Sequence, residues 1–186
     1  MTHSIQIRRL PATLALVAVA ALGLVLAVAA AAGSEPGKHR APERLVVRGE
    51  DTVKDANGGA CPGGVCQLEL TDGDFRGTLG TGQYNGSIDL NVAQGFANGE
   101  GGVCAPISGR IVLGAGSPDR LVLGISGDSC QDGEGDLTQA SFTNMAEFVV
   151  KYGTGAYAKA RGSGLATFLE DASDRGRMTL IGTIYR

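Results

Sequence analysis

Residues 152–164, YGTGAYAKARGSG, decide the fold of this chain. Glycines at this density let the backbone turn sharply and let neighbouring strands approach closely. The stretch lies between two strand-like segments near the C-terminus, so it predicts a corner in a twisted all-β structure. It supplies no nucleophile and no set of metal ligands, and it therefore indicates a fold and not a reaction.

Period-two alternation of apolar and polar residues, the pattern of half-buried strands, dominates the chain around this turn. In residues 84–92, for example, Tyr84, Ile88 and Leu90 fall on one face and Asp89 falls on the other. The same pattern predicts further strands at residues 66–70, 107–113, 120–125, 146–152, 165–170 and 178–185. Turn residues such as 114–119, GAGSPD, separate them, as in a meander of hairpins.

Eight or so short strands in one domain must close into a barrel or pair as two sheets, because open edges invite aggregation. Apolar residues on both faces of some strands favour closure around an interior filled by side chains, or partly covered by residues 56–65. We therefore predict an all-β domain over residues 45–186, a single antiparallel β-barrel of about eight strands. A β-sandwich is the alternative.

The N-terminal segment predicts export. Arg8 and Arg9 precede an uncharged apolar run at residues 10–32, which ends in small residues, as in a secretory signal peptide. The run is also long enough to cross a bilayer, so an uncleaved membrane anchor at residues 10–32 is the alternative. We interpret residues 1–33 as signal or anchor helix and residues 34–44, rich in Pro, Gly and charge, as a flexible linker.

The four cysteines all follow the predicted signal, and an even number in an oxidising compartment predicts two disulfides. Three pairings are open. We favour Cys61 with Cys66 and Cys104 with Cys130, because each pair closes a local hairpin. A zinc site is the competing interpretation, but structural zinc usually requires two close cysteine pairs and the chain has one loose pair.

The C-terminal third resembles a known group of barrels. Residues 148–164 (FVVKYGTGAYAKARGSG) and 179–184 (TLIGTI) resemble the closing strands of allene oxide cyclase-like and dirigent-like β-barrels, and small exported glycine-rich bacterial proteins of unknown function. Residues 80–87, GTGQYNGS, echo the same turn. The resemblance implies a calycin-like barrel and assigns no catalytic residue, and the disulfides and export signal depart from the plant cyclases.

Composition excludes several chemistries. The chain has 16 basic and 19 acidic side chains, and removal of residues 1–33 takes Arg8 and Arg9 and no acid, which leaves a formal charge of −5. Scattered basic residues on an acidic domain disfavour nucleic acid as a partner. The only histidines are His3 and His39, outside the predicted domain, so a histidine-dependent triad or metal site is not expected. We expect no cofactor and no metal.

Carboxylates and tyrosines remain as candidates. Residues 132–136, DGEGD, superficially resemble the opening of a calcium loop, but the later ligands are missing. The pairs Asp72 with Asp74 and Glu170 with Asp171 have the residue types of a general acid and base, although aspartate is commoner as a turn residue. Ligand-lining candidates are Tyr84, Tyr152 and Tyr157.

These patterns support two functions. The first is a noncatalytic exported barrel that binds a small apolar ligand or a cell-envelope component. The alternative is a dirigent-like or cyclase-like enzyme that guides a reactive intermediate in the barrel lumen, which requires an acid or a tyrosine buried in a pocket. The sequence carries no indication of oligomeric state.

Overall fold

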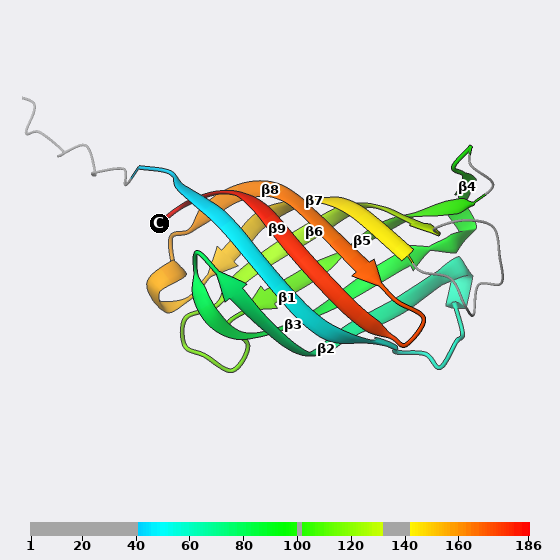
Figure 1. Ribbon diagram of the computed structural model, residues 1–186, viewed down its shortest axis with the longest axis horizontal. Coiled ribbons are helices and arrows are strands. Elements are labelled where there is room, and N and C mark those ends of the chain that lie inside the picture. The colour runs from blue at the N-terminus through cyan, green and yellow to red at the C-terminus, as the bar shows by residue number, and fades with distance from the viewer. Residues whose placement is uncertain (1–40, 100–101, 132–141) are drawn as a thin grey trace, which may run out of the picture. The chain divides into compact units, whose positions relative to one another are not determined.

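The computed structural model describes residues 41–99, 102–131 and 142–186. The predicted signal or anchor, most of the linker with His39, and the acidic stretch 132–136 lie outside these residues. The described chain forms nine strands, shown in Figure 1: β1 (Glu43–Asp55), β2 (Val65–Gly77), β3 (Gly80–Asn91), β4 (Phe96–Ala97), β5 (Val103–Leu113), β6 (Leu121–Gln131), β7 (Phe142–Gly153), β8 (Arg161–Glu170) and β9 (Arg175–Tyr185). Three short 3₁₀ turns accompany them: η1 (Pro62–Gly64), η2 (Val92–Gln94) and η3 (Gly155–Tyr157). No helix in the described ranges has the length and apolar character needed to span a bilayer.

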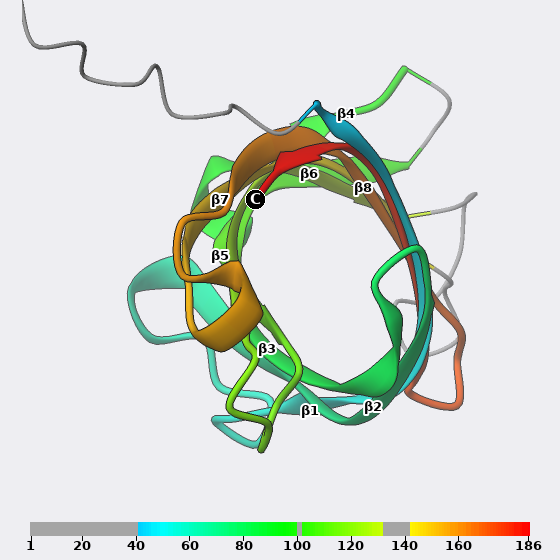
Figure 2. The same cartoon turned by 90° about the vertical axis from the view of Figure 1, so that its left-hand side faces the viewer.

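Eight of the strands close into an antiparallel barrel. The sheet order is β3-β2-β1-β9-β8-β7-β6-β5-β4, and pairing between β3 and β5 joins its two sides. Every neighbouring pair is antiparallel, and β4 is a short addition at the edge of β5. Seen end-on, the strands form a ring (Figure 2). The predicted all-β antiparallel barrel is confirmed, and the sandwich alternative is wrong.

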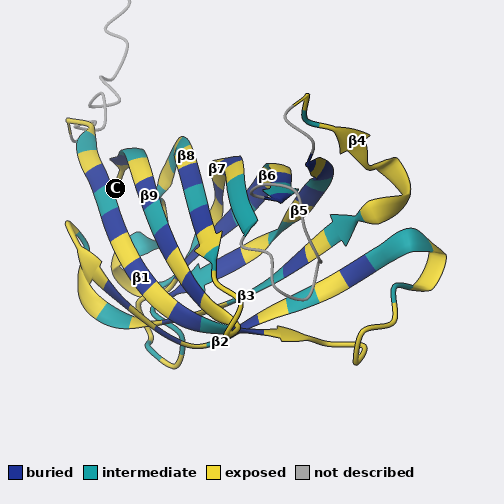
Figure 3. Cartoon of the chain, turned by 45° about the vertical axis from the view of Figure 1, so that its right-hand side comes forward, coloured by how far each residue is buried: buried dark blue, intermediate teal, exposed yellow. Residues whose placement is uncertain are grey.

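Side chains fill the inside of the barrel. Buried and exposed residues alternate along the strands, as the coloured bands in Figure 3 show. The largest fully buried side chains include Tyr84, Phe148, Leu45, Leu123 and Leu180. Burial of each large apolar side chain contributes roughly 1.5–3 kcal/mol, so this filled interior is the main source of stability.

Strand β1 is absent from the strands predicted above. It begins at Glu43, inside the segment interpreted as a linker, and it pairs with both β2 and β9. Its apolar alternation is interrupted by the polar run Arg48-Gly49-Glu50-Asp51, which hides the period of two in the sequence. The pairing of β1 with β9 brings the two ends of the barrel domain together.

A register irregularity in β7 changes the direction of one candidate side chain. Val150 pairs with Leu123 and Tyr152 pairs with Val122, so Lys151 is an extra residue in β7. An extra residue reverses the inside and outside assignment of the residues after it. Tyr152 is therefore 58% exposed on the outer surface, whereas simple alternation places it on the face of Val150.

Both favoured disulfides are present. Cys61 is bonded to Cys66 beside the η1 turn, and Cys104 is bonded to Cys130 across the β5–β6 pair. Among the described residues no cysteine is free. Two disulfides in a small domain are typical of proteins in an oxidising, extracytoplasmic compartment.

Candidate functional site

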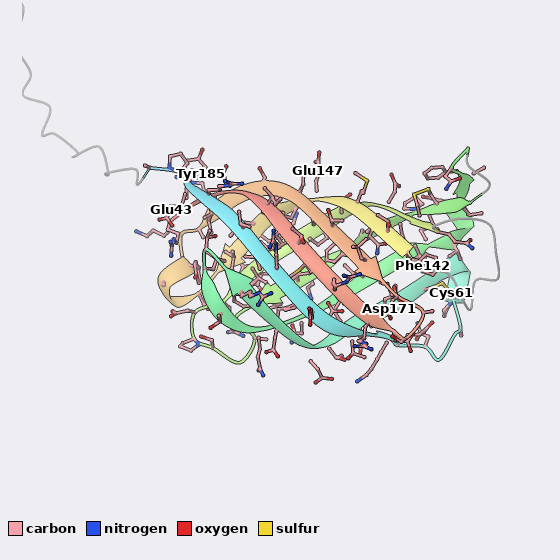
Figure 4. All side chains as sticks on the ribbon, viewed as in Figure 1. Glu43, Cys61, Phe142, Glu147, Asp171 and Tyr185 are labelled. Carbon is pink, nitrogen blue, oxygen red and sulfur yellow. A yellow bond between two sulfur atoms is a disulfide. The ribbon has the colours of Figure 1, made fainter. Side chains whose placement is uncertain are left out.

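The barrel has a pocket at each end. In Figure 4, Glu43 and Tyr185 mark one end, and Cys61, Phe142 and Asp171 mark the other. The first pocket lies at the Glu43 end, between the tip of the β2–β3 hairpin and the β5–β6 loop, and we call it the hairpin-end pocket. The second lies inside the opposite end, around Asp51 and Glu170, and we call it the acid pocket.

The hairpin-end pocket has a volume of about 230 Å³. Buried Phe75, Leu113 and Leu121 are among its lining residues, with Leu79 and Tyr157 partly buried beside them. Polar side chains complete the lining: Thr81, Gln83, Ser117 and Asp119. The pocket can therefore bind the apolar part of a small ligand, while a polar group of the same ligand contacts the hydrogen-bonding side chains.

Tyr157 reaches this pocket because the turn after β7 is fixed to the β5–β6 loop. Thr154 accepts a hydrogen bond from the amide of Arg120 at 3.1 Å and donates one to the carbonyl oxygen of Pro118 at 2.6 Å. The backbone amide of Thr154 also donates to the carbonyl oxygen of Arg120 at 2.8 Å. The guanidinium of Arg186 also lies over the Tyr157 ring, 5.6 Å from its centroid.

Gly155 allows the same turn to approach the loop. It has a φ of +55°, and the carboxylate of Asp119 accepts a hydrogen bond from the next amide, that of Ala156, at 2.8 Å. A Cβ at position 155 would overlap Asp119 Oδ1. We expect Gly155→Ala to lower the free energy of unfolding by about 1 kcal/mol, because it strains the backbone and displaces this carboxylate.

Urea unfolding followed by circular dichroism measures that change. Gly116→Ala is the matched control, because exposed Gly116 also has a positive φ, +77°, but a Cβ there would meet no atom within 4 Å, so it should lose less stability. Equal stability of Gly155→Ala and the wild-type protein would contradict the role given to the turn.

The acid pocket is built around a buried aspartate. Asp51 faces inward from β1, is 8% exposed, and accepts a hydrogen bond through Oδ2 from the hydroxyl of Tyr84. Its other oxygen, Oδ1, is buried and has no hydrogen-bond partner among the described residues. Burial raises the pKa of the Asp51 carboxyl, and the hydrogen bond from Tyr84 opposes that rise. Burial, followed by the hydrogen bond and charge of Asp51, raises the pKa of Tyr84 well above its ordinary value, so its hydroxyl stays protonated.

A second carboxyl group lies near Asp51. In the strand register Gly176 is paired with Asp51 on one side and with Glu170 on the other, so one glycine separates the two acids. Burial, with added repulsion from Asp174, Asp51 and Asp171, raises the pKa of Glu170 from 4.5 to about 7. Two carboxyl groups with raised pKa values in one pocket are typical of sites that bind or transfer protons.

The space between these acids is small. The acid pocket has a volume of about 30 Å³, enough for about two water molecules. Its polar lining includes Asn144 with the two acids, and its other walls are mainly apolar: Val53, Leu68, Leu70, Ile88, Ile107 and Phe168. In this closed form the pocket can hold water but no substrate.

The candidate tyrosines do not gather at one site. Tyr84 lies in the interior and is bound to Asp51, Tyr157 lines the hairpin-end pocket, and Tyr152 is on the outer surface. The three tyrosines therefore lie in three different environments, and they do not line one common site.

The candidate acid pairs are also divided. Asp72 is exposed at a bulge in β2, with its carboxylate 3.8 Å from the amine of Lys54, and Asp74 is exposed on the outer face. Asp171 is exposed in the β8–β9 turn, where it accepts hydrogen bonds from Ser173. The acid that lies beside Glu170 in the acid pocket is therefore Asp51, and not Asp171.

Sequence reasoning missed Asp51. The available signal is its position, because Asp51 lies at even spacing from Leu45, Val47 and Val53 and therefore falls on the apolar face of β1.

Within the described ranges no group of three or more histidine, cysteine or acidic residues could hold a metal ion. Comparison of the chain with known protein families, with curated proteins and with solved structures gives no match.

Proposed function

We propose that the protein is a noncatalytic binding module for a small, mainly apolar molecule, which it holds in the hairpin-end pocket. The observation that carries this proposal is the pocket's volume of about 230 Å³ beside a buried apolar floor. An apolar cavity of about 150 Å³ is enough for benzene, so this pocket has room for one ring with a short substituent or for a short acyl chain. The polar rim favours a ligand with one hydrogen-bonding group.

The filled barrel interior supports placing the ligand at the end of the barrel. Burial of Leu45, Leu123 and Leu180 leaves the centre occupied by protein side chains. We further infer a calycin-like barrel related to the allene oxide cyclase-like and dirigent-like group, supported by the closed eight-stranded topology and by the similarity of residues 148–164. Export by an N-terminal signal is part of the same proposal, and the two disulfides support it.

Filling the hairpin-end pocket should weaken ligand binding. Ala115, which lines the pocket, is changed to tryptophan, and the exposed Ala97 on β4 receives the same change as the matched control. N-phenyl-1-naphthylamine, an apolar fluorescent probe, is titrated into each purified protein. We expect saturable fluorescence with the wild-type protein and Ala97→Trp, and at least about a tenfold loss of affinity in Ala115→Trp. Equal binding by all three proteins would refute the assignment.

A second candidate function rests on buried Asp51 and half-buried Glu170. Asp51, Tyr84 and Glu170 provide the buried acid and tyrosine that a cyclase-like or dirigent-like enzyme requires. The acid pocket holds only about two waters, so this function needs the barrel end to open. Probe binding that survives Ala115→Trp but is lost in Leu68→Trp would move the ligand to the acid pocket and favour the enzyme.

A further inference from the structure

A third cavity lies on the outer surface, over β9, β1, β2 and β3. It is an open groove of about 630 Å³, larger than either end pocket, and we call it the arginine groove. Three exposed arginines line it, and acidic and hydroxyl side chains lie among them: Arg48, Arg76 and Arg177, with Glu50, Asp74, Thr81 and Thr179. The groove adjoins both end sites, since it shares Phe75, Thr81, Gly82 and Gln83 with the hairpin-end pocket and Arg177 with the acid pocket.

The strand register places two like charges side by side. Arg48 on β1 lies directly opposite Arg76 on β2. Thr179 follows on the β9 side and Thr81 on the β3 side, so two hydroxyl groups flank the two guanidinium groups in one row. Like charges directly opposite each other on a sheet are destabilising, so an anion bound between the two guanidinium groups would relieve their repulsion.

Carboxylates of the protein do not supply that anion. Ion pairs in the described part of the chain join Lys54 to Asp72 and Arg186 to Glu43, and neither involves an arginine of the groove. The groove acids occupy the next row, where Glu50 lies opposite Asp74 and next to Arg177. The groove therefore has one row that presents two guanidinium and two hydroxyl groups, and an adjacent row in which two carboxylate acceptors stand beside the guanidinium of Arg177.

This arrangement complements a ligand with an oxyanion at one end and hydroxyl groups at the other. Guanidinium groups bind the oxygens of phosphate in pairs, through charge-assisted hydrogen bonds. Carboxylates accept hydrogen bonds from sugar hydroxyl groups but repel a second anion. We propose that the arginine groove binds a phosphorylated saccharide, with its phosphate between Arg48 and Arg76 and its sugar hydroxyl groups on Glu50 and Asp74.

Calorimetric titration of the purified protein tests the proposal with three probes: glucose 1-phosphate, inorganic phosphate and glucose. The wild-type protein should bind glucose 1-phosphate more tightly than either part alone. The double variant Arg48→Gln/Arg76→Gln should weaken that binding at least about tenfold, because it removes both charge-assisted contacts. Arg110→Gln, which removes one exposed outer-face arginine of β5 outside the groove, is the control for lost positive charge and should bind normally.

The acid row has its own test. Glu50→Gln/Asp74→Asn should retain inorganic phosphate binding while it reduces the preference for glucose 1-phosphate over phosphate. Three results would overturn the proposal: no saturable binding of glucose 1-phosphate, the same loss in Arg110→Gln as in the double arginine variant, or equal affinity of the wild-type protein for glucose 1-phosphate and inorganic phosphate. All substituted side chains are exposed, so each variant should fold, and its circular dichroism spectrum should match that of the wild-type protein.

Discussion

Gly176→Ala is expected to lower the free energy of unfolding by about 3 kcal/mol. A Cβ at this position would overlap Asp51 Oδ1 and would lie 3.2 Å from Val53 Cγ2. The carboxylate would have to move, and it would lose its hydrogen bond from Tyr84 inside the barrel. Two buried polar groups would then lack partners, which outweighs the roughly 0.5–1 kcal/mol that alanine gains over glycine in a strand. Urea unfolding followed by circular dichroism measures the difference.

A double-mutant cycle isolates the cause. Asp51→Ala removes the carboxylate that the new methyl group would meet, so Gly176→Ala should cost much less in that background, with a coupling of about 2 kcal/mol. Gly95→Ala is the control, because Gly95 is exposed, has ordinary extended dihedral angles, φ −62° and ψ 147°, and a Cβ there would come no closer than 3.2 Å to another atom. An equal cost of Gly176→Ala with and without Asp51 would show that the glycine is needed for another reason.

The barrel could be predicted from the sequence because period-two alternation is a local property. Residues 84–91 and 146–150 keep the predicted inside and outside faces in the structure, whereas Val92, predicted on the inner face, begins the η2 turn and is exposed. The alternation fails where the backbone gains a residue, as at Lys151, because a bulge depends on pairing with β6 and has no clear local pattern. It is also hidden in β1, where Arg48 and Glu50 face solvent beside Gly49 and Asp51 on the inner face.

The sites were less predictable than the fold. The favoured disulfides join residues close in sequence or opposite in one hairpin, so local reasoning was enough. The acid pocket combines β1 with β8, and Asp51 and Glu170 are neighbours only because β9 pairs with both of these strands. The sequence therefore offered Asp171 as the partner of Glu170, while the barrel closure provides Asp51.

Glu170→Gln is expected to make the protein more stable above pH 7 and to leave its stability near pH 4 unchanged. The pKa of Glu170 is raised from 4.5 to about 7, so the folded protein binds this proton more tightly than the unfolded chain does. The stabilisation from this proton is complete below about pH 4.5 and is lost as the pH rises to about 7. A shift of this size corresponds to at most ~3 kcal/mol, and screening at the barrel end reduces the expected effect to about 1–2 kcal/mol.

The measurement is the free energy of unfolding of both proteins between pH 4 and pH 9. The wild-type value should fall relative to that of Glu170→Gln between about pH 5 and pH 7, and the two curves should run parallel on either side of this range. Asp51 remains in both proteins and its pKa is also raised, so a smaller fall of the same sign persists in the variant. Asp171→Asn is the control: its carboxylate is exposed and hydrogen-bonded to Ser173, which lowers its pKa, so this change should lower stability by the same amount throughout pH 5 to 9 and add no step between pH 5 and pH 7. Parallel curves for the wild-type protein and Glu170→Gln across the whole range would mean that Glu170 is ionised in the folded barrel, and that the acid pocket is open to water.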